Sequence, residues 1–301
     1  MIEEVDLDAA TARVLTSEIR SWFDRAAREL PWRAEDTTAW GVLVSEVMSQ
    51  QTPVARVAPA WQVWMQRWPT PTDLADATPA DVIRAWDRLG YPRRALWLRD
   101  AASKIRDDFG GQVPSNYDDL IALPGIGDYT ASAVLAFAFG QRITVLDTNV
   151  RRVIARTMWG IERPPAASPT ALERQVAQAL LPDDDAEAAH WSVASMELGA
   201  IVCRAKSPTC EVCPVARDCS WLAAGQPAAS ERARPVQRFE GTDRQVRGKL
   251  MAILRAASTP VHVDDLVSAC SDEIQRSRCL DTLIADALVE PLPNAHYTLP
   301  E

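Results

Sequence analysis

The chain has 301 residues, 47% of them hydrophobic, and a formal net charge of −9 at neutral pH. That length is sufficient for one large or two smaller hydrophobic cores. The first residues are acidic and polar, and no apolar run approaches the roughly 18 residues that a membrane span needs. We therefore expect neither a signal peptide nor a membrane span, and composition favours a globular cytoplasmic protein.

The net negative charge argues at first sight against a nucleic-acid partner. Its distribution weakens that objection, because acidic side chains gather in the N-terminal tail and in a run at 183–187. Basic side chains gather elsewhere, so a local basic face could still bind phosphate groups. These basic residues are Arg88, Arg93, Arg94, Arg99, Arg142, Arg151, Arg152 and Arg156.

Apolar residues recur at three- and four-residue spacing from residue 10 to about 222, which predicts consecutive helices separated by short Pro and Gly interruptions. Strand-like alternation is almost absent there. All 11 tryptophans precede residue 222, so this region holds the aromatic core. The clearest predicted helices cover 40–51, 54–68, 79–89, 94–109, 116–123, 128–139, 149–159, 169–181 and 188–202.

The predicted helix 40–51 is apolar except for a stripe made by Ser45, Glu46, Ser49 and Gln50. The Glu46 carboxylate therefore faces either water or a polar cleft, and spacing alone favours water. In a dry cleft, desolvation would raise the pKa of Glu46 and let it carry a proton at neutral pH.

Residues 116–140 predict two helices joined by the tight turn 123–127, which contains Gly125 and Gly127. The glycines leave backbone N–H groups uncovered at the start of the second helix, where free donors and the helix dipole favour a phosphate group. Such contacts position DNA without reading its sequence. An ordinary helical hairpin that needs glycine for its turn is the alternative interpretation.

Asp147 follows an extended run at 143–146 and precedes a predicted helix, a position that suits a helix N-cap. Backbone amides that donate to an N-cap carboxylate favour its ionised form. A catalytic carboxylate that stabilises positive charge requires the same ionised form, so both roles can hold for Asp147.

Four cysteines are grouped with the spacing C-x6-C-x2-C-x5-C, far from the other two cysteines of the chain. Thiolates in so short a loop can hold a 4Fe–4S cluster or one tetrahedral zinc ion. The single C-x2-C and the absence of an intervening histidine favour the cluster. A disulfide pair ranks third, because nothing marks the chain as secreted. The four residues are Cys203, Cys210, Cys213 and Cys219.

Residues 223–242 lose the helical periodicity and gain Pro, Gly, Ser and charge, which predicts a linker. Three helical stretches follow at 243–257, 262–270 and 272–288, and the last residues could pair as a hairpin. This order suits a small winged-helix module at 243–301. A helical cap packed on the first domain explains the pattern equally well.

The order of several motifs along the chain resembles the helix-hairpin-helix DNA glycosylases of the endonuclease III superfamily, in particular the MutY-type adenine DNA glycosylases. These motifs are SEVMSQQT, LGYPRRA, LPGIGDYTA, VLDTNVRRV, MELGA and the cysteine loop. The resemblance covers about residues 15–222. It implies an all-α glycosylase domain, 1–222, with a DNA groove and a base pocket between two lobes. One lobe would be a six-helix barrel at about 38–140. The other would combine about 10–37 with 141–222 and carry a structural 4Fe–4S cluster.

The resemblance also implies roles for single residues. Glu46 matches the general acid that protonates N7 of a flipped adenine, and Asp147 matches the carboxylate that stabilises the oxocarbenium-like sugar. Asn149 and Tyr129 match residues that line the same pocket. The remaining matches are Trp32, Arg33 and Glu197 around the adenine, Gln51, Thr52, Leu89 and Tyr91 beside the oxidised guanine, and Gly125, Gly127, Arg204 and Lys206 on phosphates.

These matches predict a base-excision-repair enzyme that hydrolyses the N-glycosidic bond of adenine opposite 8-oxoguanine or guanine. We expect a monomer that acts on duplex DNA at the nucleoid. Tyr129 stands where bifunctional lyases of the superfamily carry the lysine that attacks the sugar, so the resemblance implies a monofunctional enzyme that leaves an abasic site.

Two departures from the family pattern stand out. No Nudix-like strands follow residue 222, which makes discrimination of 8-oxoguanine from guanine less secure than adenine excision, and Thr148 replaces a common glycine. One alternative is a pyrimidine-mismatch glycosylase, which the triplet at 50–52 argues against, or an endonuclease III-like glycosylase, which Tyr129 in the lysine position argues against. Another is a non-catalytic DNA-damage binding module, against which Glu46 and Asp147 stand.

Overall fold

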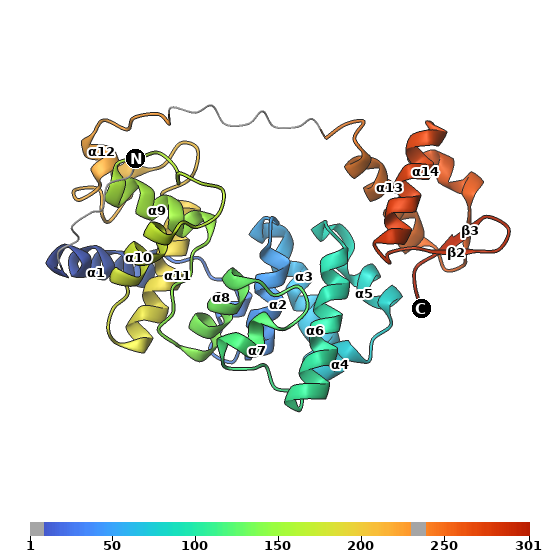
Figure 1. Cartoon of the computed structure of the whole chain (residues 1–301), viewed down its shortest axis with the longest axis horizontal. Helices are drawn as coiled ribbons and strands as arrows, with labels where there is room; N and C mark the ends of the chain where they lie inside the picture. The colour runs from blue at the N-terminus through green and yellow to red at the C-terminus, as the bar shows by residue number, and fades with distance from the viewer. Residues whose placement is uncertain (1–8, 230–238) are drawn as a thin grey trace. The chain divides into compact units, whose positions relative to one another are not determined.

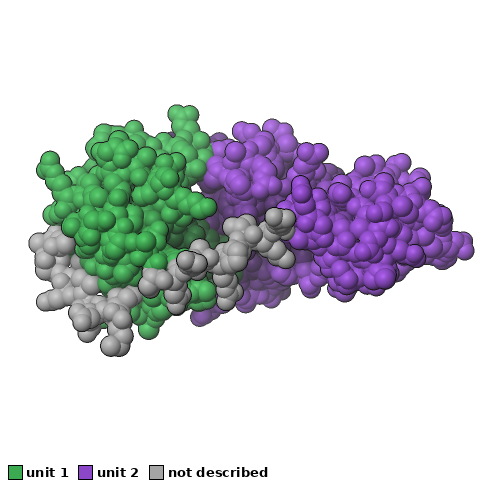
Figure 2. Space-filling model, turned by 90° about the horizontal axis from the view of Figure 1, so that it is seen from above, with its two compact units in different colours: residues 1–30, 115–117, 127–233 green, residues 31–114, 118–126, 234–301 purple. Residues whose placement is uncertain are grey.

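A computed structural model describes residues 9–229 and 239–301 of the chain (Figure 1). The acidic N-terminal tail and residues 230–238 of the predicted linker lie outside the described residues. The chain divides into two compact units, each formed by segments that are not contiguous in sequence (Figure 2). Unit 1 comprises residues 1–30, 115–117 and 127–233, and unit 2 comprises residues 31–114, 118–126 and 234–301.

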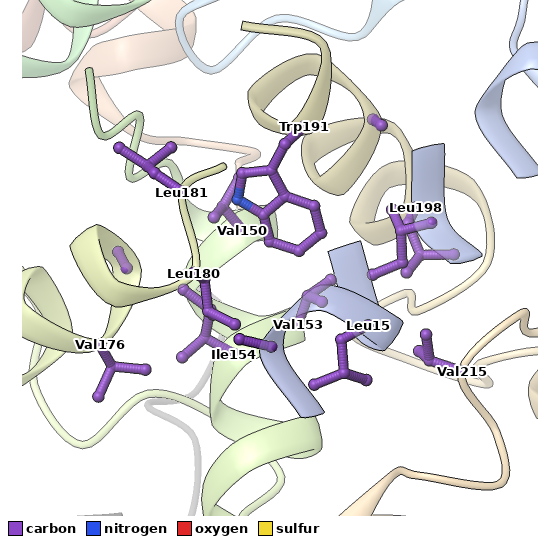
Figure 3. Close-up of a cluster of buried hydrophobic side chains, with 14 of the residues drawn as sticks. Leu15, Val150, Val153, Ile154, Val176, Leu180, Leu181, Trp191, Leu198 and Val215 are labelled. Atoms are coloured by element: carbon purple, nitrogen blue, oxygen red, sulfur yellow. The ribbon is translucent and has the colours of Figure 1, made fainter. Parts of the chain in front are cut away.

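Unit 1 is helical. Its core is built where α1, α9 and α11 pack together, and Figure 3 shows Leu15, Val153 and Trp191 converging in it. Gly199 on α11 permits this packing, because a Cβ atom there would lie 2.6 Å from the Cβ atom of Asn149 on α9. The helices are α1 (Ala9–Ala26), α8 (Asp128–Phe139), α9 (Thr148–Trp159), α10 (Ala171–Ala179), α11 (Asp185–Ile201) and α12 (Ser220–Ala223), with a 3-10 turn η3 (Cys210–Val212).

The part of unit 2 formed by residues 31–114 and 118–126 is also helical and is built around tryptophans. Trp64 contacts Trp68 and Trp86 edge-on, with ring centroids 4.8 and 5.4 Å apart. The indole N–H of Trp64 donates to the Ala85 carbonyl, so this buried polar group is satisfied. The elements are η1 (Pro31–Arg33), α2 (Ala39–Ser49), α3 (Val54–Arg67), α4 (Pro71–Ala75), α5 (Pro79–Trp86), η2 (Asp87–Leu89), α6 (Arg93–Phe109) and α7 (Tyr117–Ile121), whose first residue belongs to unit 1.

The C-terminal part of unit 2 is a winged-helix-like module with its own small sheet. Strand β3 pairs antiparallel with both β1 and β2, so that His262 faces His296 across the first pair. Apolar residues of α13 pack on Ala80 and Ile83 of α5, which joins the module to the rest of unit 2. The elements are α13 (Asp243–Ala256), β1 (Val261–His262), η4 (Val263–Ala269), α14 (Glu273–Ala285), β2 (Glu290–Leu292) and β3 (His296–Thr298).

The structure confirms the predicted all-α class and the nine helices named from the sequence, with ends that shift by a few residues. The structure also contains a strand at 261–262, which the sequence pattern did not predict because the strand has only two residues. The boundaries at 222 and 242 stay predictions. Among the described residues, no helix combines the length and apolarity needed to cross a membrane.

Candidate active site

Glu46 lies in the last turn of α2 and is only 6% exposed. Its helix begins at Ala39, after the N-cap Thr38, whose hydroxyl accepts a hydrogen bond from the Gly41 N–H at 3.2 Å. Every residue of α2 from Trp40 to Met48 is buried, so the polar stripe enters the interior at Ser45 and Glu46. The preference for water that spacing alone suggested is therefore wrong, because spacing cannot show what covers a polar stripe.

Asp147 forms the N-cap of α9, as the sequence predicted. Its carboxylate accepts hydrogen bonds from the backbone N–H groups of Asn149 (2.8 Å) and Val150 (2.6 Å) and from the side-chain amide of Asn149 (2.6 Å). Burial nevertheless raises the pKa of Asp147 above its ordinary value, and these donors and the Arg152 charge oppose that rise without cancelling it. The expectation that the backbone amides keep the Asp147 carboxylate ionised is therefore corrected, because burial outweighs their effect on its pKa.

A chain of hydrogen bonds leads from Asp147 to the cysteine loop. The Asn149 side-chain oxygen accepts from Nη2 of Arg152 at 2.8 Å, and Nε of Arg152 donates to the Cys203 carbonyl at 2.7 Å. Arg152 also donates to the Gly199 carbonyl at 2.7 Å. Because Asn149 packs directly against Gly199, both the backbone contact and the hydrogen bonds fix its position beside Asp147.

Tyr129 and Glu197, the two other predicted pocket residues of unit 1, both have partners inside that unit. The Tyr129 hydroxyl lies 3.5 Å from the sulfur of Met196. Glu197 is 1% exposed and holds Arg28 through two short contacts of 2.6 and 2.7 Å. The sequence did not identify Arg28, since 169 residues separate this pair and neither residue lies in a shared motif.

Arg94 joins the two turns of unit 2 that carry the predicted oxidised-guanine contacts. Its guanidinium donates to the Val47 carbonyl at the end of α2 (2.6 Å), to the Thr52 hydroxyl (3.1 Å) and to the Gly90 carbonyl (3.0 Å). Thr52 in turn donates to the Leu89 carbonyl at 3.0 Å. Burial lowers the pKa of Arg94 to about 10, and the side chain is only 5% exposed.

These two turns present Gln51 and Tyr91 in an uncommon backbone conformation. Gln51 has φ +54° and Tyr91 has φ +47°, values that cost free energy in residues other than glycine. Tyr91 remains 46% exposed. The structure thus brings the four predicted contacts Gln51, Thr52, Leu89 and Tyr91 into one region, with Arg94 as the residue that sequence reasoning had placed only on a basic face.

The two glycines of the predicted phosphate turn have different roles. Gly125 has φ +73°, and a Cβ atom there would lie 2.8 Å from the Cβ atom of Trp97, so packing alone requires glycine. Gly127 is the N-cap of α8 with φ −106°, and among the described residues nothing lies within 4 Å of a Cβ atom built on it. Open space in front of an uncapped helix N-terminus suits a phosphate contact.

Most of the arginines expected on a basic face are engaged inside the protein instead. Arg151 pairs with Glu173 at 2.7 Å with both side chains buried, and Arg156 lies 4.4 Å over the Trp221 ring. Among the eight expected residues only Arg88 and Arg93 are exposed. In the cysteine loop, Arg204 and Lys206 are both exposed.

The four grouped cysteines line one small cavity in unit 1. All six cysteines, which lie in the described residues, are free thiols, so the disulfide interpretation finds no support. Within the described residues, no group of three or more His, Cys, Asp or Glu is placed to hold a single metal ion. A cubane differs from a single ion because each thiolate binds its own iron. Four thiol groups around one cavity are the donor set that such a cluster needs.

Each unit therefore holds one part of the predicted site. Unit 2 holds Glu46, the four contacts near Arg94, and Trp32 with Arg33 in η1, where Trp32 meets Trp61 edge-on. Unit 1 holds Asp147, Asn149, Tyr129, Glu197 and the cysteine loop.

Comparisons with known proteins agree with these observations. The family model described as "HhH-GPD superfamily base excision DNA repair protein" matches residues 44–179. The adenine DNA glycosylase of Mycolicibacterium smegmatis is 49% identical over 283 residues, which covers 94% of both chains. The human adenine DNA glycosylase is 40% identical over 70% of this chain and 40% of its own length.

Among solved structures, a thermostable thymine-DNA glycosylase is similar with a TM-score of 0.65 and 25% identity, over 72% of this chain and 100% of that chain. The similarity to this structure covers only part of the chain, whereas the similarity to the Mycolicibacterium smegmatis enzyme covers nearly all of it. The chain therefore belongs to the adenine DNA glycosylase family, within the HhH-GPD superfamily of base excision DNA repair proteins.

Proposed function

We propose that this chain hydrolyses the N-glycosidic bond of adenine mispaired with 8-oxoguanine or guanine in duplex DNA. The observation that carries the proposal is the 49% identity with an adenine DNA glycosylase over 94% of the chain. The buried Glu46 on α2 and the capped Asp147 on α9 supply the two carboxyl groups that this chemistry needs.

In the proposed reaction, Glu46 donates its proton to N7 of an adenine that has left the base stack. Burial in a low-dielectric interior favours the neutral form of a carboxyl group, which is the form that can donate. The glycosidic bond then breaks with its electron pair moving to the base. Asp147 offsets the positive charge that develops on the sugar, and a water molecule adds to the sugar carbon and releases a proton.

Asn149 has a positioning role in this proposal. Its backbone and side-chain N–H groups both point at the Asp147 carboxylate, while Arg152 fixes its side-chain oxygen. Tyr129 cannot form the Schiff base that a lysine would form with the sugar. The proposed product is therefore free adenine and an intact abasic strand.

The proposed cofactor is a 4Fe–4S cluster held by Cys203, Cys210, Cys213 and Cys219. When bound, it would cross-link the loop that follows α11 and take no part in base removal. Nη1 of Arg156 lies 3.4 Å from the Cys203 sulfur and donates to the Arg204 carbonyl at 2.8 Å. These contacts would hold the loop so that Arg204 and Lys206 face the DNA backbone.

DNA phosphates are the proposed ligands of the Gly127 end of α8 and of the two exposed cations in the cysteine loop. We expect the protein to act as a monomer on the nucleoid. Contacts of this kind release counterions, so affinity should fall as salt concentration rises.

Three duplexes test the proposal directly, with adenine opposite 8-oxoguanine, adenine opposite guanine, and thymine opposite guanine. The expected products are free adenine from the first two duplexes and strand breaks only after alkali treatment. Thymine release would favour the pyrimidine-mismatch alternative. Breaks without alkali, together with borohydride trapping in matching yield, would show that a lysine attacks the sugar after all.

A further inference from the structure

The chain turns back toward the cysteine loop directly after α12. Gly225 and Gln226 have φ +77° and +59°, and the Gln226 N–H donates to the Trp221 carbonyl at 2.9 Å, which closes the turn. Residues 226–229 follow, and we call them the strap. Residues 226–228 of the strap are exposed, so burial of apolar surface contributes little to its position.

Hydrogen bonds fix the strap at two points of unit 1 instead. The indole N–H of Trp221 donates to the Pro227 carbonyl at 2.9 Å. The Ala229 N–H donates to the Glu162 carboxylate, which lies beyond the end of α9, at 2.8 Å. Trp221 is only 6% exposed and lies 4.4 Å beneath the Arg156 guanidinium, so it is a well-packed anchor. The strap therefore connects α12 to the segment that follows α9.

Between these anchors the strap reaches a proposed cluster ligand. Nε2 of Gln226 donates to the Cys210 sulfur at 3.4 Å. Cys210 opens η3, and Val212 of the same turn is 61% exposed. In the part of the core that the structure describes, Cys203 and Cys213 pack against the buried residues of unit 1, whereas Cys210 does not. The strap thus contacts the cysteine loop where the core gives least cover.

Each of the four grouped sulfur atoms accepts from an N–H group, but the donors differ in kind. Arg156 donates to Cys203 from a buried guanidinium. Cys213 and Cys219 accept from backbone N–H groups that follow them in sequence. Gln226 differs from these donors because it is an exposed side chain beyond the last cysteine. A single substitution can therefore remove its N–H and leave the backbone donors in place.

A hydrogen bond to a ligating sulfur affects an iron–sulfur cluster in two ways. It withdraws negative charge from the thiolate, and hydrogen bonds to the sulfur atoms are one determinant of the reduction potential. It also occupies a lone pair that a proton from water would take when the ligand dissociates. Groups that hold metal ligands from outside typically account for ~10–100-fold in metal affinity or activity.

We propose that the strap covers the Cys210 side of the cluster site and that the Gln226 amide stabilises the bound cluster by donating to the Cys210 thiolate. The inference rests on the proposed 4Fe–4S cofactor and adds a positioning residue outside its four ligands. Trp221 and Glu162 hold the strap so that the amide stays at the sulfur.

The test uses the full-length protein with its cluster and the variant Gln226→Glu, which keeps the side-chain size but replaces the donor with a negative charge. Iron release to a ferrous-iron chelator without oxygen should be about tenfold faster. The midpoint potential of the cluster should become more negative, because the reduced form loses a stabilising donor. Gln178→Glu is the matched control, since it adds the same charge at an exposed position of α10 in the same unit, and both quantities should equal those of the wild-type protein.

A second variant, Gln226→Gly, separates the lost hydrogen bond from the added charge. Glycine suits the positive φ of this position, so the backbone should keep its course. Iron release should be about threefold faster than in the wild-type protein, less than in Gln226→Glu because no charge is added. A wild-type rate in Gln226→Gly would mean that the amide contributes nothing, which overturns the inference.

A third variant, Trp221→Phe, tests the anchor. It keeps a ring beneath Arg156 and removes the N–H that holds the Pro227 carbonyl. Iron release should be faster than in the wild-type protein, and a wild-type rate would overturn the role given to the strap. Wild-type values in all three variants would overturn the inference while the cluster assignment stands. A wild-type protein that contains zinc instead of iron would refute the proposed cofactor itself, and adenine excision measured in parallel tests the proposed function separately.

Discussion

The two candidate catalytic carboxyl groups occupy contrasting positions on their helices. Asp147 precedes α9 and accepts three hydrogen bonds from N–H groups of its own chain segment. Glu46 lies inside α2, where its helix neighbours Val42, Val47 and Met48 are all buried. A helix N-terminus provides free backbone donors and the positive end of the helix dipole, whereas backbone N–H groups further along a helix are already bonded within it.

The difference shows how one fold can give two carboxyl groups different tasks. Donors at a helix start favour the anion, and burial favours the neutral acid. At Asp147 burial outweighs the donors and raises its pKa, so the donors act to limit a shift that burial imposes. The division of labour therefore depends on surroundings that single substitutions can alter.

The largest expected effect is at Glu46. Glu46→Gln keeps the shape of the side chain but cannot donate the proton, so single-turnover adenine excision should fall by at least ~10²–10⁴-fold. DNA binding should be retained. Glu35→Gln is a suitable control because Glu35 is exposed in the same unit. Normal excision by Glu46→Gln would show that another group protonates the base.

A substitution in the cysteine loop tests how far this loop stabilises unit 1, which carries Asp147. Cys213→Ser should abolish the brown colour expected of a 4Fe–4S protein and destabilise unit 1, by a cost comparable to the ~2–5 kcal/mol of losing a native disulfide. Cys270→Ser, outside the loop, should leave the visible absorbance unchanged. The measurements are absorbance and thermal unfolding. A colourless, zinc-containing wild-type protein of full activity would contradict the cluster assignment.

A substitution of Arg94 tests how far its hydrogen bonds stabilise unit 2, which carries Glu46. Arg94→Lys replaces the planar group that donates to the Val47 carbonyl, the Thr52 hydroxyl and the Gly90 carbonyl with a single ammonium group that cannot reach both turns. We expect a loss of about 3 kcal/mol in the free energy of unfolding, since hydrogen bonds to charged groups contribute ~1.5–3 kcal/mol. Arg67→Lys, at a surface pair with Asp81, should change it by less than about 0.5 kcal/mol. Equal effects in both variants would refute the role given to Arg94.

The smallest expected effect comes from the helix contact behind Asn149. A Cβ atom at Gly199 would approach Asn149 to 2.6 Å, so Gly199→Ala should push α9 and α11 apart and cost ~1–3 kcal/mol. Excision should fall with it, because Asn149 orients Asp147. In contrast, no described atom lies within 4 Å of a Cβ atom built on Gly248 of α13. Gly248→Ala should therefore stabilise the protein by ~0.5–1 kcal/mol, because alanine is favoured over glycine inside a helix. Denaturant unfolding and single-turnover rates compare the two variants.

Periodicity predicted the helices because a core-facing stripe repeats along each one, and local signals predicted the Asp147 cap. The surroundings of Glu46 could not be predicted, since they depend on which elements cover the stripe. Arg28 with Glu197 and Arg93 with Asp286 join residues far apart in sequence, and no local pattern marks such pairs. The arginines show the same limit, because Arg94 and Arg151 are as basic in sequence as Arg204 yet lie buried.

The pH dependence of single-turnover adenine excision tests the division between the two carboxyl groups most directly. An ionised Asp147 is required, so the rate should rise with pH through a pKa above the ordinary aspartate value. A protonated Glu46 is required, so the rate should fall again at higher pH. The account predicts that Glu46→Gln removes this alkaline decline from the residual activity and keeps the acidic limb. A variant that keeps the alkaline decline and the wild-type rate would contradict the assignment of Glu46 as the acid.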